Sequence, residues 1–419
     1  MSTRIKGFYK LSPEERLNIV SESAGLTEQD KAVIRGEEGF TVQNADNMVE
    51  NVIGYMPVPV GVAVNFKVDG KDVFIPMATE EPSVVAAASN AARLAYNTGG
   101  FTTSFNGSIM IGQVHVTDLK NPYGALATIY ENKEAILEKC NEQDPTLVSF
   151  GGGAIDLEVR VVETSAEKLL VVHLFVDTKD AMGANAVNTM NEAVAPLIEE
   201  LTGGVVVLRI LSNLADRRIV RARAVFEDPF DGNQEMLNRF IKAYELAAAD
   251  PYRAATHNKG IMNGISAAVL ATGNDTRAIE AGAHAYAARN GKYTTLTHYE
   301  LGENNTIVGT IELPLAVGLV GGATKSHPVA QVGTKILGVK TARELSGIIA
   351  ALGLAQNFAG LRALASEGIQ RGHMKLHTRN MAVQAGAQPE EVDAVVALAV
   401  KEGKYRFDDI KRYLEEVKK

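Results

Sequence analysis

The stretch TEEPSVVAAASNAARLAYNTGG, from Thr79 to Gly100, decides the architecture that we expect for this chain. Pro82 and Ser83 lead into the small-residue run Val84–Tyr96, and a glycine pair closes the run, as is typical of a helix end. Alanine favours the helix and adds little bulk, so neighbouring backbone can come close. We therefore predict a helix over 84–96 at the centre of a large domain.

Strand and turn signals precede this helix. The β-rich runs Val60–Val64 and Val73–Ile75 are separated by Asp69-Gly70, a pair that favours a tight turn between two strands. Further upstream, two N-cap signals each open a short helix that a glycine ends. These signals are Ser12-Pro13-Glu14-Glu15 with Gly25, and Thr27 and Asp30 with Gly36.

Residues 109–217 alternate between strand and helix patterns. Apolar runs at 109–116, 169–176 and 205–210 predict strands, and 186–201 predicts a helix. This is the pattern of a compact α+β unit inserted in a larger one. We predict a mixed α/β and α+β fold with three parts: a large domain (1–108 and 218–370), a small domain (109–217) and a C-terminal helical flap (371–419).

Helices dominate the rest of the chain. Apolar residues recur at helical spacing over 234–249, and Asp250-Pro251 ends that pattern. Gly- and Ala-rich helices follow to about residue 370, and a charged helix is predicted over 408–419.

Composition limits the class of protein. The 42 basic and 50 acidic residues give a net charge of −8 with no long basic run, which excludes nucleic acid or a membrane surface as the main partner. The single cysteine, Cys140, excludes an internal disulfide. No apolar signal stands near residue 1, and the longest small apolar stretch, 84–95, is shorter than the roughly 20 residues of a spanning helix. We expect a cytoplasmic protein.

Neither common phosphate-binding fingerprint is present. In GLVGGATKS, Gly318–Ser326, Thr324 replaces the last P-loop glycine, and the triple glycine at 151–153 precedes a predicted strand over 155–162. The segment Asp177–Asn185, in contrast, follows a strand and opens a helix. Either its Gly183 lets a pyrophosphate approach the helix N-terminus, or its Asp180 caps an ordinary helix. Spacing alone leaves both readings open.

Lys259 stands in an unusual setting within Asp250–Gly264, beside small and apolar neighbours. A partly desolvated ammonium group there would act strongly on a nearby oxyanion, whereas the alternative is a lysine that extends from a loop into solvent. Asp275, in a glycine turn, could hold this lysine. With Glu81 and His373, the chain offers one cation, two carboxylates and one imidazole.

His373 and His377 are one helical turn apart, as two metal ligands could be. However, Met374 replaces the glutamate of a zinc-protease motif and no third ligand is evident. We predict no metal and interpret His373 as a proton donor, a role that suits an imidazole pKa near 6.5.

At seven places the sequence resembles the class II, bacterial and archaeal type, 3-hydroxy-3-methylglutaryl-coenzyme A (HMG-CoA) reductases, in the order of that family. The matching stretches are ENVIG (50–54), TEEPSVVAAAS (79–89), DAMGANAVNTM (180–190), RILSNLAD (209–216), DPYRAATHNKGIMNG (250–264), ATGND (271–275) and GIQRGHMKLH (368–377).

The resemblance implies an enzyme that interconverts HMG-CoA and mevalonate plus CoA through two hydride transfers, by way of a hemithioacetal and mevaldehyde. Lys259 would stabilise each oxyanion, Asp275 would orient Lys259, Glu81 would donate a proton and His373 would protonate the CoA thiolate. The substrate contacts that the resemblance implies are Ser83, Arg253, Asn263 and Gln356.

The resemblance also assigns the dinucleotide to the small, non-Rossmann domain. Asp144 would bond the adenine ribose and repel a 2′-phosphate, so we expect NADH to be preferred, with NADPH as the alternative. The other implied cofactor contacts are Asp180, Met182, Gly183, Asn185 and Asn213. The chain departs from the family at two positions: Ile155 stands where a basic residue is frequent, and Thr276 where a tryptophan is frequent.

The family fold implies a large domain around a central helix, a C-terminal flap that carries the histidine, and a homodimer with its active site at the interface, often within a trimer of dimers. Two other readings compete with the reductase. One is a CoA-dependent lyase or acyl transferase without nicotinamide, and the other is a catalytically silent nucleotide-binding protein.

Overall fold

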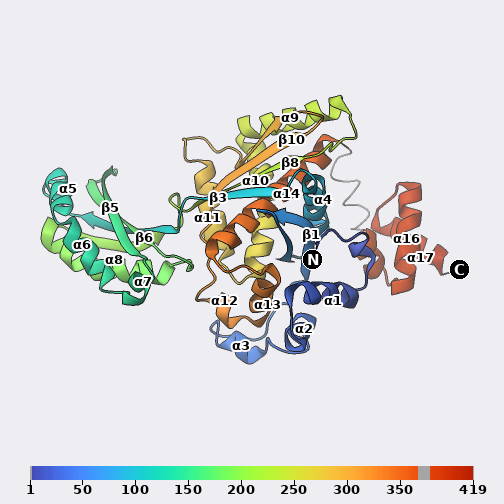
Figure 1. Cartoon of the computed structure of the whole chain (residues 1–419), viewed down its shortest axis with the longest axis horizontal. Coiled ribbons are helices and arrows are strands. Elements are labelled where there is room, and N and C mark those ends of the chain that lie inside the picture. Colours follow the sequence, from blue (N-terminus) through green and yellow to red (C-terminus); the bar gives the residue numbers. More distant parts are fainter. Residues whose placement is uncertain (1, 367–377, 419) are drawn as a thin grey trace.

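Two separate β-sheets organise the computed structural model, which describes residues 2–366 and 378–418. The larger has six strands in the order β2-β1-β3-β8-β10-β9, and the smaller has four in the order β5-β6-β4-β7. Figure 1 shows the small sheet and its helices at one end of the long axis, the large sheet in the middle, and the C-terminal helices at the other end.

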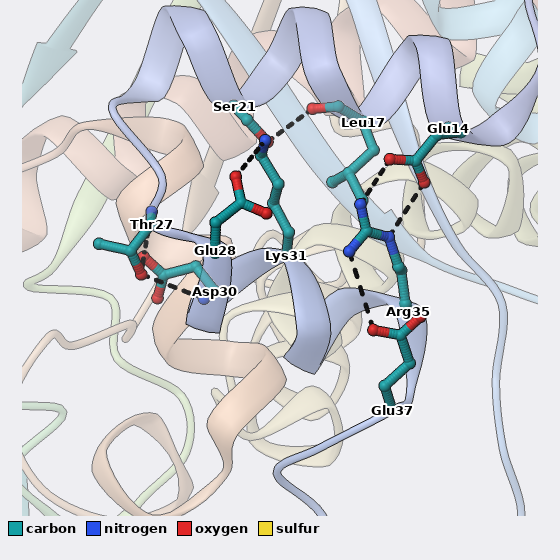
Figure 2. Close-up of polar contacts among 9 residues, drawn as sticks. All are labelled: Glu14, Leu17, Ser21, Thr27, Glu28, Asp30, Lys31, Arg35 and Glu37. Carbon is teal, nitrogen blue, oxygen red and sulfur yellow. Dashed lines mark hydrogen bonds and ion pairs between the residues drawn. The ribbon is translucent and has the colours of Figure 1, made fainter.

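The N-terminal helices begin and end where the capping signals predict. Both α1 and α2 open on a capping box, with Ser12 and Thr27 as N-caps, and both end at a glycine with positive φ. Arg35 of α2 joins the two helices through the carboxylate of Glu14 (Figure 2). The elements here are the 3-10 helix Phe8–Lys10, α1 (Pro13–Ala24), α2 (Glu28–Arg35) and α3 (Val42–Asp46).

The six-stranded sheet forms one wall of the large domain. Its first two strands are the predicted hairpin, which turns at Asp69-Gly70 with positive φ at both residues. The bounds are β1 (Val60–Val68), β2 (Lys71–Ala78), β3 (Phe101–Phe105), β8 (Ile219–Phe226), β9 (Thr297–Leu301) and β10 (Ile307–Pro314).

The central helix of the large domain is α14 (Ala342–Ala365), not the predicted helix over 84–96. That helix, α4, has the predicted bounds Val84–Tyr96 and packs on β1 and α14, but one of its faces is exposed. Helix α14 is buried on every face over residues 345–358, and 67% of its most apolar window is inside the fold, although its length and composition alone would suit a membrane span. An all-round apolar helix is typical of a protein core.

Helix α10 (Pro251–Ala271) packs closely against α14. A Cβ atom on Gly353 of α14 would lie 2.7 Å from the Ile265 Cδ1 atom of α10, so any larger residue would force the Ile265 side chain to move. The helix α9 (Gln234–Ala249) has its predicted bounds, and Asp250 then caps α10 instead of ending helical structure. The remaining helices of this domain are α11 (Thr276–Ala287), α12 (Ala323–Ser326) and α13 (Pro328–Leu337).

The small sheet and its helices come from residues 109–212. All of its strand pairs are antiparallel, which agrees with the missing Rossmann fingerprint because a Rossmann sheet is mostly parallel. Helix α8 packs on β4 and β7. The elements are β4 (Ile109–Thr117), α5 (Pro122–Glu131), α6 (Lys133–Asn141), α7 (Pro145–Ser149), β5 (Gly153–Glu163), β6 (Lys168–Asp177), α8 (Ala184–Thr202) and β7 (Val205–Ser212).

The C-terminal helices α16 (Pro389–Glu402) and α17 (Phe407–Val417) bury a hydrophobic cluster of their own, separate from the main core. Figure 1 shows them beyond α1, at the end of the molecule opposite the small sheet. His373 and His377 lie outside the described residues.

Candidate active site

Lys259 and Glu81 meet in the large domain. The Lys259 Nζ atom lies 3.0 Å from the Glu81 Oε2 atom, and the lysine is 60% exposed while the glutamate is 35% exposed. Glu81 lies in the turn between β2 and α4, and Lys259 lies in the middle of α10. The alternative prediction, which placed this lysine in a loop, is therefore wrong. Ser83, two residues after Glu81, has φ 71°, a strained value for a residue other than glycine. Such strain persists mainly at functional sites.

A buried polar network holds the residues just before Lys259. The His257 Nε2 atom lies 2.6 Å from the Thr297 hydroxyl of β9, and that hydroxyl donates to Asn357 Oδ1 of α14 at 3.0 Å. Asn357 in turn donates to the His257 carbonyl at 3.0 Å. Asn258 donates to the Thr294 carbonyl at 2.9 Å. Helix α10 is thereby fixed in rotation, which orients Lys259 toward Glu81.

Asp275 has partners other than Lys259. Within residues 2–366 and 378–418, no ion pair joins the two, and the Asp275 Oδ1 atom accepts from the backbone N–H groups of Arg277 and Ala278 at 3.0 and 3.1 Å and lies 3.5 Å from the Arg277 Nε atom. That Asp275 orients Lys259 stays a prediction. Among the described residues, Glu81 is the carboxylate that pairs with the ammonium group.

Among the described residues, three buried polar atoms on α10 and α14 lack a hydrogen-bond partner. They are Nη1 of Arg253 and Nδ1 of His257, on α10, and Oε1 of Gln356, on α14. Burial lowers the pKa of Arg253. Asn263 lies one helical turn after Lys259 on α10. Because buried polar groups are nearly always paired in folded proteins, the unpaired guanidinium nitrogen of Arg253 fits an anionic group of a ligand, and the amide oxygen of Gln356 fits a hydrogen-bond donor such as a hydroxyl group.

The predicted cofactor loop opens α8. Gly183 has φ 92°, and a Cβ there would lie 2.2 Å from the Thr178 Cγ2 atom, so this position requires glycine. No side chain caps α8, so the N–H groups of its first turn, next to the exposed Asn185, are free for a ligand. These features fit a pyrophosphate group at a helix N-terminus.

Asp180 caps a helix, but not the one that follows it. Its Oδ1 atom accepts from the Ala342 N–H at the start of α14, at 2.7 Å. The alternative in which Asp180 caps α8 is therefore wrong, because no side chain caps that helix. The role of Asp180 as a cofactor contact stays a prediction. Met182 packs against the core at the same junction, and Asn213 is exposed just after β7.

Asp144 is the N-cap of α7, where its Oδ1 atom accepts from the Leu147 N–H at 2.8 Å. Its second carboxylate oxygen has no such bond. In the part of the chain that the structure describes, no group of three or more His, Cys, Asp or Glu side chains is arranged to hold a metal.

Comparison with known proteins gives a consistent picture. The sequence profile of hydroxymethylglutaryl-coenzyme A reductase matches residues 12–378. The 3-hydroxy-3-methylglutaryl-coenzyme A reductase of Archaeoglobus fulgidus is 59% identical over 419 residues, which cover 100% of this chain and 95% of that protein. A probable reductase of Borreliella burgdorferi is 39% identical over 345 residues, covering 80% of this chain and 77% of that protein.

Solved structures agree. A 3-hydroxy-3-methylglutaryl-coenzyme A reductase from Streptococcus pneumoniae has a TM-score of 0.84 and 42% identity, over 98% of this chain and 99% of that chain. A structure of the class II reductase from the same organism, bound to NADPH in open conformations, has a TM-score of 0.82 and 42% identity, over 98% of this chain and 100% of that chain.

The fold and these matches define a nicotinamide-dependent oxidoreductase. The chain belongs to the hydroxymethylglutaryl-coenzyme A reductase family, which confirms the resemblance seen in its sequence. Its activity is the interconversion of HMG-CoA and mevalonate.

We predict that His257→Asn changes how stability depends on pH. Burial lowers the pKa of His257 to about 3, whereas an unfolded histidine has a pKa near 6.5. The unfolded chain therefore takes up a proton before the folded chain, and the wild type loses stability as the pH falls below about 6.5. The variant has no such group.

In urea unfolding followed by far-UV circular dichroism, the stability of the wild type should fall relative to that of His257→Asn by up to about 1.4 kcal/mol per pH unit between about pH 6 and pH 4. Carboxylates titrate in both proteins and cancel in the difference. A difference that stays constant over this range would contradict a neutral, buried His257.

Proposed function

We propose that Lys259 and Glu81 carry the chemistry of HMG-CoA reduction, with two hydrides supplied by the nicotinamide cofactor when it is bound. The observation that carries this proposal is the 3.0 Å contact between the two side chains, next to the strained Ser83. Each hydride addition to a carbonyl carbon leaves negative charge on oxygen. The Lys259 ammonium group stabilises that charge, and Glu81 supplies the proton.

Substrate recognition uses Arg253 and Gln356, each of which has an unpaired buried atom, together with two residues of the matching motifs. The Arg253 guanidinium binds the free carboxylate of the hydroxymethylglutaryl group, and Ser83, Asn263 and Gln356 supply hydrogen bonds. We retain Asp275 and His373 in the catalytic set on their motif matches alone. In that assignment, His373 protonates the CoA thiolate as it leaves.

We further propose a cavity of about 1030 Å³ as the site of the CoA arm. One end lies at Val85 and Ala86, just after Ser83, and its wall is largely apolar, which suits a pantetheine chain. Cationic side chains line it as well, which suits the phosphates of CoA. They are Arg4, Lys6, Arg16, Arg35 and Arg93.

For the cofactor, we propose that the pyrophosphate lies at the open N-terminus of α8 and that Asp144 sets the preference for NADH. The related class II enzyme of Streptococcus pneumoniae binds NADPH, so nicotinamide use is common to both. The free oxygen of Asp144 supports a bond to a ribose 2′-hydroxyl, and its charge would repel a 2′-phosphate. We expect the enzyme to work in the cytoplasm, where its buried Cys140, with a pKa raised by burial to about 12, stays a thiol.

We also propose a homodimer, with a trimer of dimers as its higher assembly. The segment 48–56, which contains the ENVIG motif, exposes large apolar side chains, and Ile53 is fully exposed at 102%. Exposed apolar patches of this kind mark protein interfaces. The others in the segment are Met48, Val49, Tyr55 and Met56.

For catalysis, Lys259→Ala should lower kcat by at least about 10²–10³-fold with HMG-CoA and equally with added mevaldehyde, because one ammonium group serves both oxyanions. Absorbance of the reduced cofactor measures both steps. Lys242→Ala, an exposed lysine on α9, is the control and should keep full activity. Loss of only one step would contradict a shared role for Lys259.

For cofactor choice, Asp144→Asn should raise kcat/KM with NADPH relative to NADH by about tenfold, since removing a charge contact of this kind alters affinity by about 1–2 kcal/mol. Asparagine keeps the α7 cap and removes only the charge. Steady-state kinetics with both cofactors measures the ratio. A wild type that prefers NADPH, or an unchanged ratio in the variant, would refute the role of Asp144.

For assembly, Ile53→Glu should convert the oligomer to monomers and abolish activity, because a charge in an apolar interface is strongly unfavourable. Size-exclusion chromatography with light scattering gives the mass. Tyr123→Glu, at an exposed aromatic residue of α5, should change neither mass nor activity. An active monomer would show that one chain holds a complete site.

A further inference from the structure

Arg218 is a fully buried arginine at the junction of the two sheets, with 0% of its surface exposed. Its Nη1 atom donates to the Thr178 hydroxyl at 2.9 Å and to the Ala181 carbonyl at 3.0 Å, both in the predicted cofactor loop. Its Nη2 atom donates to the Val317 carbonyl of the large domain at 2.6 Å. One side chain therefore ties the small domain's loop to the large domain.

The surroundings keep this guanidinium charged in spite of its burial. Burial lowers the pKa of Arg218 to about 10, and the carboxylates of Asp177 and Asp180 oppose that shift. Arg218 is therefore a cation at neutral pH. A buried charge is expensive unless it is paired and hydrogen-bonded, and its Nε atom has no partner. An apolar side chain would fill this position at lower cost, so packing alone does not explain an arginine here.

A continuous set of contacts leads from Arg218 to the catalytic turn. Val317, which Arg218 binds, precedes Gly318, whose N–H donates to the Asn274 side chain at 2.8 Å. Asn274 is the neighbour of Asp275. On the other side, Thr178 packs directly under Gly183, where a Cβ atom would lie 2.2 Å from its Cγ2 atom.

Two further bonds fix the same loop to the large domain. Asp180 accepts from the Ala342 N–H of α14 through its side chain, and its carbonyl accepts from the Leu319 N–H at 2.8 Å. The loop 177–183 is thus held to the large domain at several points, and among the described residues Arg218 is the side chain that bonds to both Thr178 and Val317.

We propose that Arg218 is a positioning residue, which holds the cofactor loop 177–183 at a fixed place relative to the turn 273–275 and so sets the approach of the nicotinamide to the substrate. The inference rests on the proposed cofactor role of this loop. A small misplacement of reacting groups can lower a rate by about 10²-fold, so a residue that fixes two loops can matter without touching either ligand.

The test compares Arg218→Met and Arg218→Lys with Arg217→Met, the exposed neighbour. For Arg218→Met we expect the KM for NADH to rise and kcat to fall, each by about 10-fold, with the KM for HMG-CoA changed less than about twofold. Arg218→Lys should recover part of the loss, and Arg217→Met should behave as the wild type. Equal changes in both KM values, or a lowered melting temperature with unchanged kinetics, would overturn the proposal.

Thr178→Val provides a milder variant in case Arg218→Met does not fold, since it removes the hydroxyl that accepts from Arg218 and that donates to the Ser108 and Ala181 carbonyls. It should raise the KM for NADH in the same selective way. Asn185→Ala separates the two hypotheses, because it tests the proposed cofactor contact in the first turn of α8, directly after the loop. If Asn185→Ala leaves NADH binding unchanged, the loop assignment fails. If it weakens binding while the Arg218 and Thr178 variants do not, the positioning role alone fails.

Discussion

The packing of α10 against α14 is the constraint on which the rest of the structure depends. Gly353 lets the two helices approach closely, and the chain of bonds through His257, Thr297 and Asn357 fixes how α10 is rotated. The apolar contact supplies the burial, and the polar network selects one arrangement among those that burial alone would permit. Lys259 therefore reaches Glu81 because of residues that never contact it.

Local signals in the sequence predicted local structure well. The capping residues Ser12 and Thr27 placed two helices, and the bounds of α4 and α9 agree with the patterns that predicted them. The central helix was misassigned although Thr341 and Glu344 mark the start of α14, because capping signals give the bounds of a helix and not its depth in the fold. Patterns report where a helix begins, but its depth in the fold depends on what packs around it.

From the sequence, site residues could be predicted only where they lie in a stretch that resembles the family. The stretches around Glu81 and Lys259 identified that pair, although no spacing rule relates residues so far apart in the chain. Asp180 caps the start of α14, 162 residues away, instead of the helix that follows it, and no local pattern could have predicted that partner. Arg218 had no signal at all, because sequence patterns treat an arginine as a surface residue.

The chain segment that forms the small sheet is inserted between β3 and β8, two neighbouring strands of the large sheet. β3 and β8 are antiparallel partners, with Phe105 opposite Val220, so residues 109–217 begin and end at almost the same point. An insertion with adjacent ends can be gained, lost or exchanged in evolution without disturbing the register of the sheet that hosts it. If the small domain binds the cofactor and the large domain the thioester, as proposed, the two binding functions can have separate evolutionary histories, and their compatibility depends on the few bonds at the junction of the two domains.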